Sequence, residues 1–296
     1  MPRLVAMVAM LTLFGCSGAA PKLPTGGAGP AGGKAAEWIK KGDEAWQTRH
    51  LEPKLREALD AYVKAWQVEP SSRHALEMLS QSQFYLGERF LDDPDKKEEA
   101  HANGLQYAML ALLENPKIRE RMDFLADKNS SPLAKRKHVG DCVEFAGKED
   151  MAALYWLGVN WGRWGELRGI VRQTMDIPKI FAVMNKTLEL DPTYHGGGPH
   201  RFFGAYYEAI PAMSGKDLEK SQDHFEKALQ VAPKFLSNKV LYAQYYGVGA
   251  DQEELYDRML KEVLEAPDDL LPESRIDNDQ AKRKAKDLVE KKDEIF

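Results

Sequence analysis

The chain has 296 residues, a formal net charge of −5 at pH 7 and only two cysteines. The sequence shows no basic stripe of the kind that neutralises phosphates, so nucleic-acid binding is disfavoured. With so few cysteines a disulfide-rich scaffold is excluded, and a body of this length must be held by its own apolar core.

The N-terminus has the order of a secretory signal. Arg3 gives a positive start, and the apolar run 4–14 is too short to span a bilayer, which needs about 20 residues. The segment Leu13-Phe14-Gly15-Cys16 resembles a lipobox, in which cleavage frees a cysteine for lipidation, although Phe14 is bulky for that position. Residues 1–15 are therefore predicted to be a lipoprotein signal peptide and Cys16 the lipidated residue. Cleavage after Gly18-Ala19-Ala20 is the alternative.

Residues 16–33 read as the lipidated cysteine followed by a Gly/Ala/Pro tether with no core-forming side chains. A flexible chain of this length reaches roughly 20–25 Å. We therefore expect a lipid-anchored body in the cell envelope, facing the periplasm. Ser17, rather than an aspartate, follows Cys16, which favours the outer membrane. A lipidated Cys16 would leave Cys142 as an unpaired, buried thiol.

From residue 34 to residue 296 the pattern predicts one all-α domain. Apolar residues recur at spacings of three and four, with charged residues between them, most clearly over 218–232 and 251–265. A last helix is expected near 277–293. No long alternation of β-branched residues predicts a strand.

The prolines expected to follow the ends of these helices are Pro70, Pro116, Pro192, Pro233 and Pro267, with spacings of 46, 76, 41 and 34 residues. Small residues precede several of them where paired helices would touch, for example Ala58 and Ala65 before Pro70. This pattern is typical of cryptic tetratricopeptide-like repeats, which are stacked helical hairpins. We expect four to five hairpins, whose curvature could enclose a concave face or a pore.

The stretch 149–167 is rich in tryptophan and glycine. On a helix Leu157, Trp161 and Trp164 share one face, beside Gly158, Gly162 and Gly165. Glycine costs a helix interior about 1 kcal/mol relative to alanine, so something is expected to pack close to this stripe. A neighbouring helix is the simpler interpretation, and an aromatic pocket wall is the functional one.

The segment 195–200, HGGGPH, leads into a helix over 200–210. Three glycines before a helix could cradle an anion, and His195 and His200 could bind a metal, but the Lys-Ser/Thr of a P-loop is missing. A tight interhelical loop is the simpler interpretation. The sequence contains no G-x-S-x-G, H-E-x-x-H or C-x-x-C motif, so we predict no enzyme, no metal and no cofactor.

Several segments, in their order, resemble the TRAP transporter T-component family. The resemblance rests on several segments rather than on one diagnostic motif. These are the hairpin ending at Ala58–Pro70, Leu154-Tyr155-Trp156 with the Trp161/Trp164 pair, Tyr194–His200 running into Phe203-Gly204-Ala205-Tyr206-Tyr207, the helix Leu218–Leu229, and the ending with Arg275, Asn278 and Ala281–Ala285.

The resemblance implies a periplasmic lipoprotein of a TRAP-type transport system, which imports small organic anions. It implies docking of a solute-binding protein, assembly as a homotrimer, and a pore that holds a small or hydrophobic ligand. The chain departs from the family pattern by longer loops around 87–99 and 127–140. The residues expected to contact ligand or partner are Trp161, Trp164, His195, His200, Phe203 and Tyr207.

Two other functions remain open at this point. One is a scaffold lipoprotein of a cell-envelope assembly complex, because the fold does not specify the partner. The other is a hydrolase that uses His195 or His200.

Overall fold

The computed structural model describes residues 35–127, 129–210 and 215–296. The predicted signal peptide, Cys16 and the tether lie outside the described residues. Every regular element within the described ranges is helical, which confirms the all-α prediction. None of the helices described there is long and apolar enough to cross a membrane.

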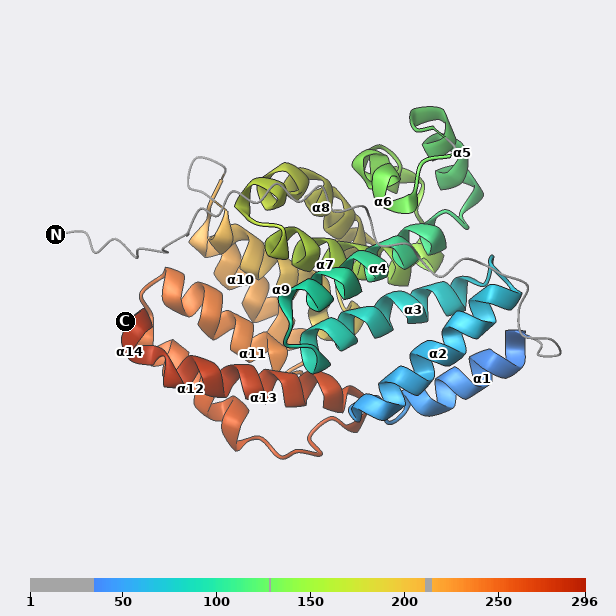
Figure 1. The fold of residues 1–296 in the computed structure, drawn as a ribbon. Helices are drawn as coiled ribbons and strands as arrows, with labels where there is room; N and C mark the ends of the chain where they lie inside the picture. The colour runs from blue at the N-terminus through green and yellow to red at the C-terminus, as the bar shows by residue number, and fades with distance from the viewer. Residues whose placement is uncertain (1–34, 128, 211–214) are drawn as a thin grey trace.

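The helices follow one another with short connections (Figure 1). In chain order they are α1 (Ala35–Trp46), α2 (Glu52–Val68), α3 (Arg73–Tyr85), the π-helix η1 (Leu86–Phe90), α4 (Pro94–Leu112), α5 (Pro116–Leu125), α6 (Pro132–Lys135), the 3₁₀ turns η2 (Arg136–Asp141), η3 (Val143–Phe145) and η4 (Lys148–Asp150), α7 (Met151–Leu167), α8 (Ile170–Leu190), α9 (Tyr194–Ala209), α10 (Leu218–Val231), α11 (Ser237–Tyr242), the π-helix η6 (Ala243–Gly247), α12 (Glu253–Glu265), the 3₁₀ turn η7 (Pro272–Ser274), α13 (Arg275–Glu290) and α14 (Lys292–Ile295).

Local sequence sets the helix boundaries. Asp93 and Asn115 cap α4 and α5, because their side chains accept hydrogen bonds from backbone N–H groups of the first turn. The proline after each cap occupies the first helical position. Pro70, Pro192 and Pro233 each lie two residues after the end of a helix, as the proline pattern predicted. Pro116 starts α5 and lies four residues after the end of α4.

Consecutive helices pack as pairs: α1 with α2, α3 with α4, α7 with α8, and α9 with α10. The pair of α7 and α8 lies between Pro116 and Pro192, where the proline spacing predicted a hidden unit. The tetratricopeptide register and the pore stay predictions. The regions around 87–99 and 127–140, expected as loops, are mostly helical, with η1, the start of α4, α6 and η2 falling in them.

The helix α13 begins beside the first hairpin and runs back across the molecule toward the C-terminus (Figure 1). Just before it, the backbone carbonyl of Glu273 accepts a hydrogen bond from Arg49, at the turn between α1 and α2, at 2.6 Å. Farther along, Arg283 donates to the carbonyl of Arg89 in η1 at 3.2 Å. This crossing closes the stack by joining its two ends.

One buried glycine fixes how closely α4 approaches α7. A Cβ added at Gly104 would lie 2.5 Å from Oδ1 of Asn160. Fully buried Asn160 donates to the carbonyls of Ser80 and Trp156 at 3.2 and 2.9 Å, and the Ser80 hydroxyl donates to the carbonyl of Gly104 at 2.7 Å. Three helices thereby share one polar contact inside an apolar core.

The predicted glycine stripe of α7 is packed tightly at only one of its three positions. A Cβ at Gly158 would clash with Met184 of α8. Gly165 would meet Gln173 at an ordinary 3.6 Å, and Gly162 has nothing within 4 Å. The simpler interpretation, a neighbouring helix, therefore applies to Gly158.

Replacing Gly104 by alanine is expected to lower the free energy of unfolding by about 1–3 kcal/mol, because the methyl group displaces Asn160. Gly162→Ala is the matched control. Its site is open, so it should gain up to about 1 kcal/mol of helix propensity. Urea unfolding measures both, and an equal gain in the two variants would contradict the packing described here.

Candidate functional site

Two of the six predicted site residues, Trp161 and Trp164, are buried between α7 and α8. The indole N–H of Trp161 donates to the buried carboxylate of Asp176 at 2.9 Å. The guanidinium of Arg136 lies over both indole rings, at 5.9 Å from Trp161 and 4.9 Å from Trp164. Both tryptophans thus belong to the core.

His200, Phe203 and Tyr207 meet around His224 of α10. Nδ1 of His200 lies 3.0 Å from Nδ1 of His224, and the ring of Tyr207 stacks on His224. Phe203 is buried beneath them. Burial and the neighbouring His200 lower the pKa of His224 to about 4, and burial lowers the pKa of His200, so both imidazoles are neutral at pH 7. The Nδ1–H of one ring then donates to the Nδ1 of the other.

His195 stands apart from both groups and has an unusual backbone. Its φ is 48°, followed by 62° at Gly196 and 76° at Gly197, so three successive residues are left-handed. A non-glycine residue in this region costs about 1–3 kcal/mol and is found mostly where the surroundings enforce it. The glycines also let the turn approach its neighbours, since a Cβ at Gly196 would lie 2.8 Å from Phe235.

Buried Arg201 enforces this turn. Its guanidinium donates to the carbonyls of Gly196 and His195 at 3.2 and 3.3 Å, and to Oδ1 of Asn238 at 2.7 Å. It also donates to the Tyr155 hydroxyl at 3.1 Å. The glycine-rich segment is therefore a tight turn whose carbonyls face an internal cation.

The ring of His195 lies in an aromatic enclosure. Its centroid is 5.0 Å from Trp156, 5.2 Å from Phe235 and 5.4 Å from Tyr155. Nε2 of His195 lies 3.4 Å from Oδ1 of Asp277 in α13. We refer to Tyr85, Tyr155, Trp156, His195, Phe235 and Asp277 together as the His195 centre.

Asp277 is the residue of the His195 centre that both Tyr85 and His195 contact through polar atoms. The hydroxyl of Tyr85 donates to its two oxygens at 2.9 and 3.1 Å. Burial and the Asp277 charge raise the pKa of Tyr85 well above its usual value, so this hydroxyl stays protonated and donates. Next in sequence, Asn278 bonds Lys234 and Leu236 on either side of Phe235, which holds that ring against His195.

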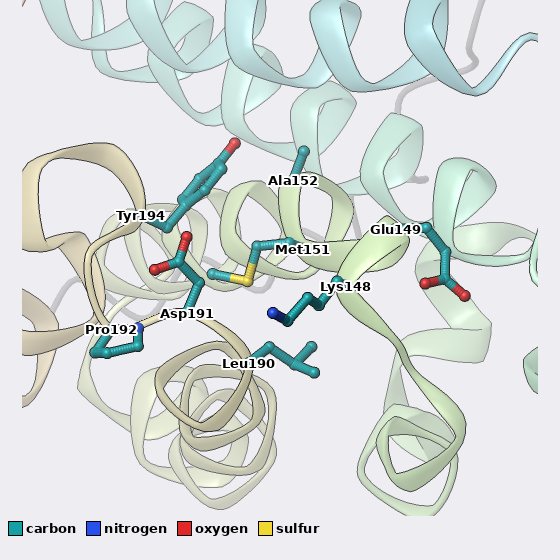
Figure 2. A pocket seen from close by; sticks show the side chains of 8 residues that line it. All are labelled: Lys148, Glu149, Met151, Ala152, Leu190, Asp191, Pro192 and Tyr194. Carbon is teal, nitrogen blue, oxygen red and sulfur yellow. The ribbon is translucent and has the colours of Figure 1, made fainter.

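An open pocket of about 550 Å³ is lined in part by Tyr194 (Figure 2). Tyr194 packs against Tyr155 and His195, so it separates the pocket from the His195 centre. The lining mixes apolar side chains with charged ones: Met151, Ala152, Leu190, Pro192 and Tyr194 with Lys148, Glu149 and Asp191.

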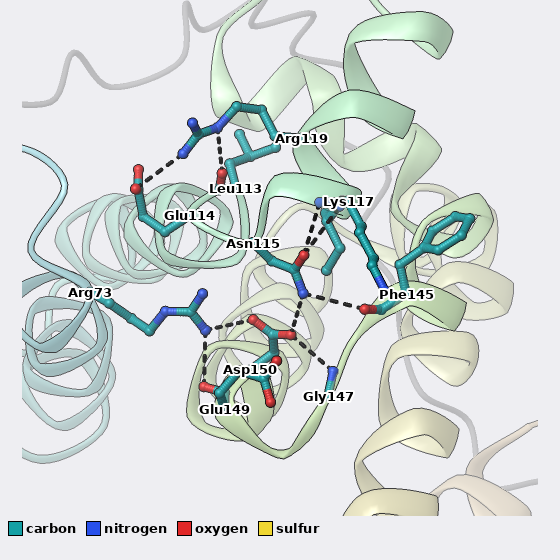
Figure 3. Close-up of polar contacts among 11 residues, drawn as sticks. Arg73, Leu113, Glu114, Asn115, Lys117, Arg119, Phe145, Gly147, Glu149 and Asp150 are labelled. Carbon is teal, nitrogen blue, oxygen red and sulfur yellow. Dashed lines mark hydrogen bonds and ion pairs between the residues drawn. The ribbon is translucent and has the colours of Figure 1, made fainter.

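The rim of this pocket is fixed by fully buried Asp150 (Figure 3). Its carboxylate accepts from Arg73 at 2.5 Å, from the Asn115 amide at 2.7 Å and from the backbone N–H of Gly147 at 2.9 Å. The network joins α3, the start of α5 and the turn before α7. Lys148 and Glu149 are therefore held on a rigid edge.

Glu77 of α3 is a second carboxyl in this region, and the residue is partly buried. Its Oε1 atom is buried and has no hydrogen-bond partner among the described residues. Burial raises the pKa of Glu77 to about 7, against the lowering effect of Arg73 and His74. This carboxyl is therefore half protonated near neutral pH.

The described residues contain no group of three or more His, Cys, Asp and Glu side chains that could hold a metal ion. Cys142 is buried, as expected, and burial raises the pKa of its thiol to about 11, which suppresses its reactivity.

Tyr85, Asp277 and Arg201 were not among the residues predicted for the site. Asp277 shares one face of α13 with Gln280 and Lys284, a spacing that predicts a polar stripe but does not say which helix it meets. The six predicted residues do not form one wall, since the structure divides them between two clusters and the separate His195. Their contact with a ligand or partner stays a prediction.

These features define an all-α protein whose interior holds an aromatic and polar centre but no recognisable catalytic set in the part that the structure describes. The TRAP transporter T-component family matches residues 95–296, about two thirds of the chain. The chain therefore belongs to this family, which supplies components of transporters rather than enzymes. No curated protein matches the chain.

Glu77→Gln is expected to stabilise the protein at pH 8 by about 2 kcal/mol. The folded pKa of about 7 exceeds the ordinary value of 4.5, so stability falls as the pH rises between the two values. The gain from glutamine should be absent below pH 4.5, grow up to pH 7 and then stay constant. Thermal unfolding at several pH values measures it, with exposed Glu69→Gln as the control. A gain that does not change with pH would contradict the assignment.

Proposed function

We propose that this protein is a periplasmic, lipid-anchored component of a TRAP-type transport system. In this proposal it docks a solute-binding protein and holds a small or hydrophobic ligand within its helical body. Membership of the T-component family is the observation that carries the proposal. The docking partner, the ligand and the homotrimer are inferred from that membership.

An exposed apolar stripe on α8 supports docking. Val171 and Met175 are 71% and 61% exposed, and Pro178 continues the same face. On α5, Phe124 is 80% exposed. Both helices pack against η2, on the same side of the molecule (Figure 1). Exposed apolar side chains grouped on a surface favour a protein interface, and we propose this surface for the solute-binding protein.

The His195 centre supports the ligand part of the proposal. It combines a strained backbone, an enclosed imidazole and a buried carboxylate next to an open pocket. Of the six predicted residues, His195, His200 and Tyr207 retain exposed surface, so these three are proposed to contact a ligand or partner.

The lipid anchor is tested by Cys16→Ala. Without the thiol no lipid can be attached, so the variant should move from the membrane fraction to the soluble periplasmic fraction. Fractionation followed by immunoblotting measures this, with Cys142→Ala as the control that keeps the anchor. Retention of the Cys16→Ala protein in membranes would refute the lipid anchor.

Docking is tested by recovering partners of the tagged, full-length protein from solubilised membranes. We expect a solute-binding protein to be recovered. The double variant Val171→Glu/Met175→Glu should lose it, because two charges would be buried at the interface. Leu264→Glu, at a 41% exposed apolar position on α12, is the matched control.

Three results separate the possibilities. Recovery of envelope-assembly proteins without any solute-binding protein would overturn the docking function. Undiminished recovery by the α8 variant would move the docking surface elsewhere. Sedimentation of the same variant shows whether the charges have instead disrupted self-association.

A further inference from the structure

Three arginine side chains converge on the buried ring of Trp164. The guanidinium carbons of Arg136 in η2, Arg168 at the end of α7 and Arg172 in α8 lie 4.9, 5.6 and 5.7 Å from the ring centroid. The face of an indole attracts cations, and tryptophan is the aromatic side chain that binds them best. We refer to Trp164 and these three residues together as the arginine cluster.

The arginine cluster holds more positive than negative charge. Arg168 donates to Glu98 of α4 at 2.8 Å, and Nη2 of Arg136 lies 3.9 Å from Oδ2 of Asp176. Arg172 is partly buried and forms no ion pair with the carboxylates of the described residues. Three cations therefore meet two carboxylates, and Arg172 supplies the surplus charge.

Arg136 is the member that is most crowded by like charges. Its side chain is 13% exposed, and its Nε atom is buried without a hydrogen-bond partner among the described residues. Burial lowers the pKa of Arg136, and the charges of Arg172 and Arg168 lower it further, although Asp176 opposes them. A negative charge brought to Arg172 would reduce this repulsion.

Arg172 lies beside the exposed apolar stripe of α8. Met175 follows Arg172 by three residues and Val171 by four, and residues at these spacings are neighbours on a helix surface. The surplus positive charge is therefore adjacent to the two apolar side chains that we propose for docking. Protein interfaces are enriched in arginine, methionine and aromatic residues, so this combination fits a protein partner.

The size of the surplus selects the kind of partner. A surface that binds anionic lipids by charge typically carries about four to eight lysines and arginines. A nucleic-acid site neutralises several phosphates. The arginine cluster offers one uncompensated charge, and one carboxylate neutralises it. The planar guanidinium of arginine matches a carboxylate through two parallel hydrogen bonds.

We propose that Arg172 binds an aspartate or glutamate side chain on the solute-binding protein, and that apolar residues beside this carboxylate cover Val171 and Met175. The pair sets the orientation of docking, because complementary charges at an interface contribute specificity and association rate. This inference rests on the proposed docking function and adds the chemistry of the partner's surface to it.

Titration calorimetry tests the pair, with the full-length protein in detergent and the solute-binding protein that it recovers from membranes. Arg172→Gln should weaken binding by about tenfold or more, as expected for an arginine that anchors an interface. Arg172→Glu should weaken it further, because two carboxylates then meet. Arg172→Lys should retain part of the affinity, since it keeps the charge but loses the parallel hydrogen bonds.

Arg258→Glu is the matched control. Arg258 is exposed on α12, lies far from α8 in Figure 1, and also forms no ion pair with the described residues. The same change of charge there should leave the affinity unaltered. Circular dichroism verifies that each variant is folded, and unchanged affinity in folded Arg172→Glu protein would overturn the pair.

Salt and charge reversal test the partner's carboxylate. Raising sodium chloride from about 50 to about 500 mM should weaken binding of the unaltered protein more than that of Arg172→Gln, because the variant lacks the pair that salt screens. One acidic-to-lysine substitution on the solute-binding protein should restore binding to Arg172→Glu. If no such substitution restores it, the pair is overturned.

The remaining outcomes separate this pair from the docking function on which it rests. If no solute-binding protein is recovered, the docking function fails and the pair fails with it. If one is recovered and binds Arg172→Glu as tightly as the unaltered protein, docking stands and only the pair fails. Binding to phosphatidylglycerol vesicles that Arg172→Gln abolishes would overturn the pair in favour of a lipid surface. Altered sedimentation of Arg172→Gln would overturn it in favour of a second copy of this chain.

Discussion

The buried carboxylate of Asp277 joins three distant parts of the chain. It accepts from Tyr85 of α3 and faces His195 of α9, from a position on α13 that is 192 residues from Tyr85. A carboxyl group at 7% side-chain exposure is tolerated only when hydrogen-bond partners surround it. The docking of α13, the left-handed turn at His195 and the position of the α3 end therefore depend on one another.

The same helix, α13, contributes polar side chains to two places in the body. Asp277, Gln280 and Lys284 lie at three- and four-residue spacing, so they follow one face of α13. Asp277 reaches the His195 centre, and Gln280 donates a hydrogen bond to Glu88 of η1. A single helix face, within the C-terminal part of the family match, thus contacts both α9 and η1.

Sequence reasoning succeeded where a local rule decides the outcome. The apolar periodicity over 218–232 and 251–265 became α10 and α12, because an amphipathic pattern fits only one secondary structure. The five prolines fall near helix ends because proline lacks the backbone N–H that the helix interior uses and is favoured in a first turn. The family resemblance was also visible, since it rests on the order of many segments.

The site was harder to predict, because aromatic residues serve the core and a ligand site equally well. Trp161 and Phe203, which were predicted as site residues, are buried in packing contacts. Tyr85 and Asp277, which were not predicted, lie in helices with no distinguishing motif. Their roles arise from α13 crossing α3 and α9. No periodicity within α13 specifies that crossing.

The sequence by itself determined the all-α class, the approximate helix boundaries and the family. These depend on hydrogen bonds and side-chain spacing within a few turns of one helix. Only the tertiary structure decided which polar side chains meet. A buried charge chooses its partner by where the packed helices place it, and contacts across nearly 200 residues have no local signature. The turn at His195 shows both levels: its glycines were visible in the sequence, but its strain and the arginine that holds it were not.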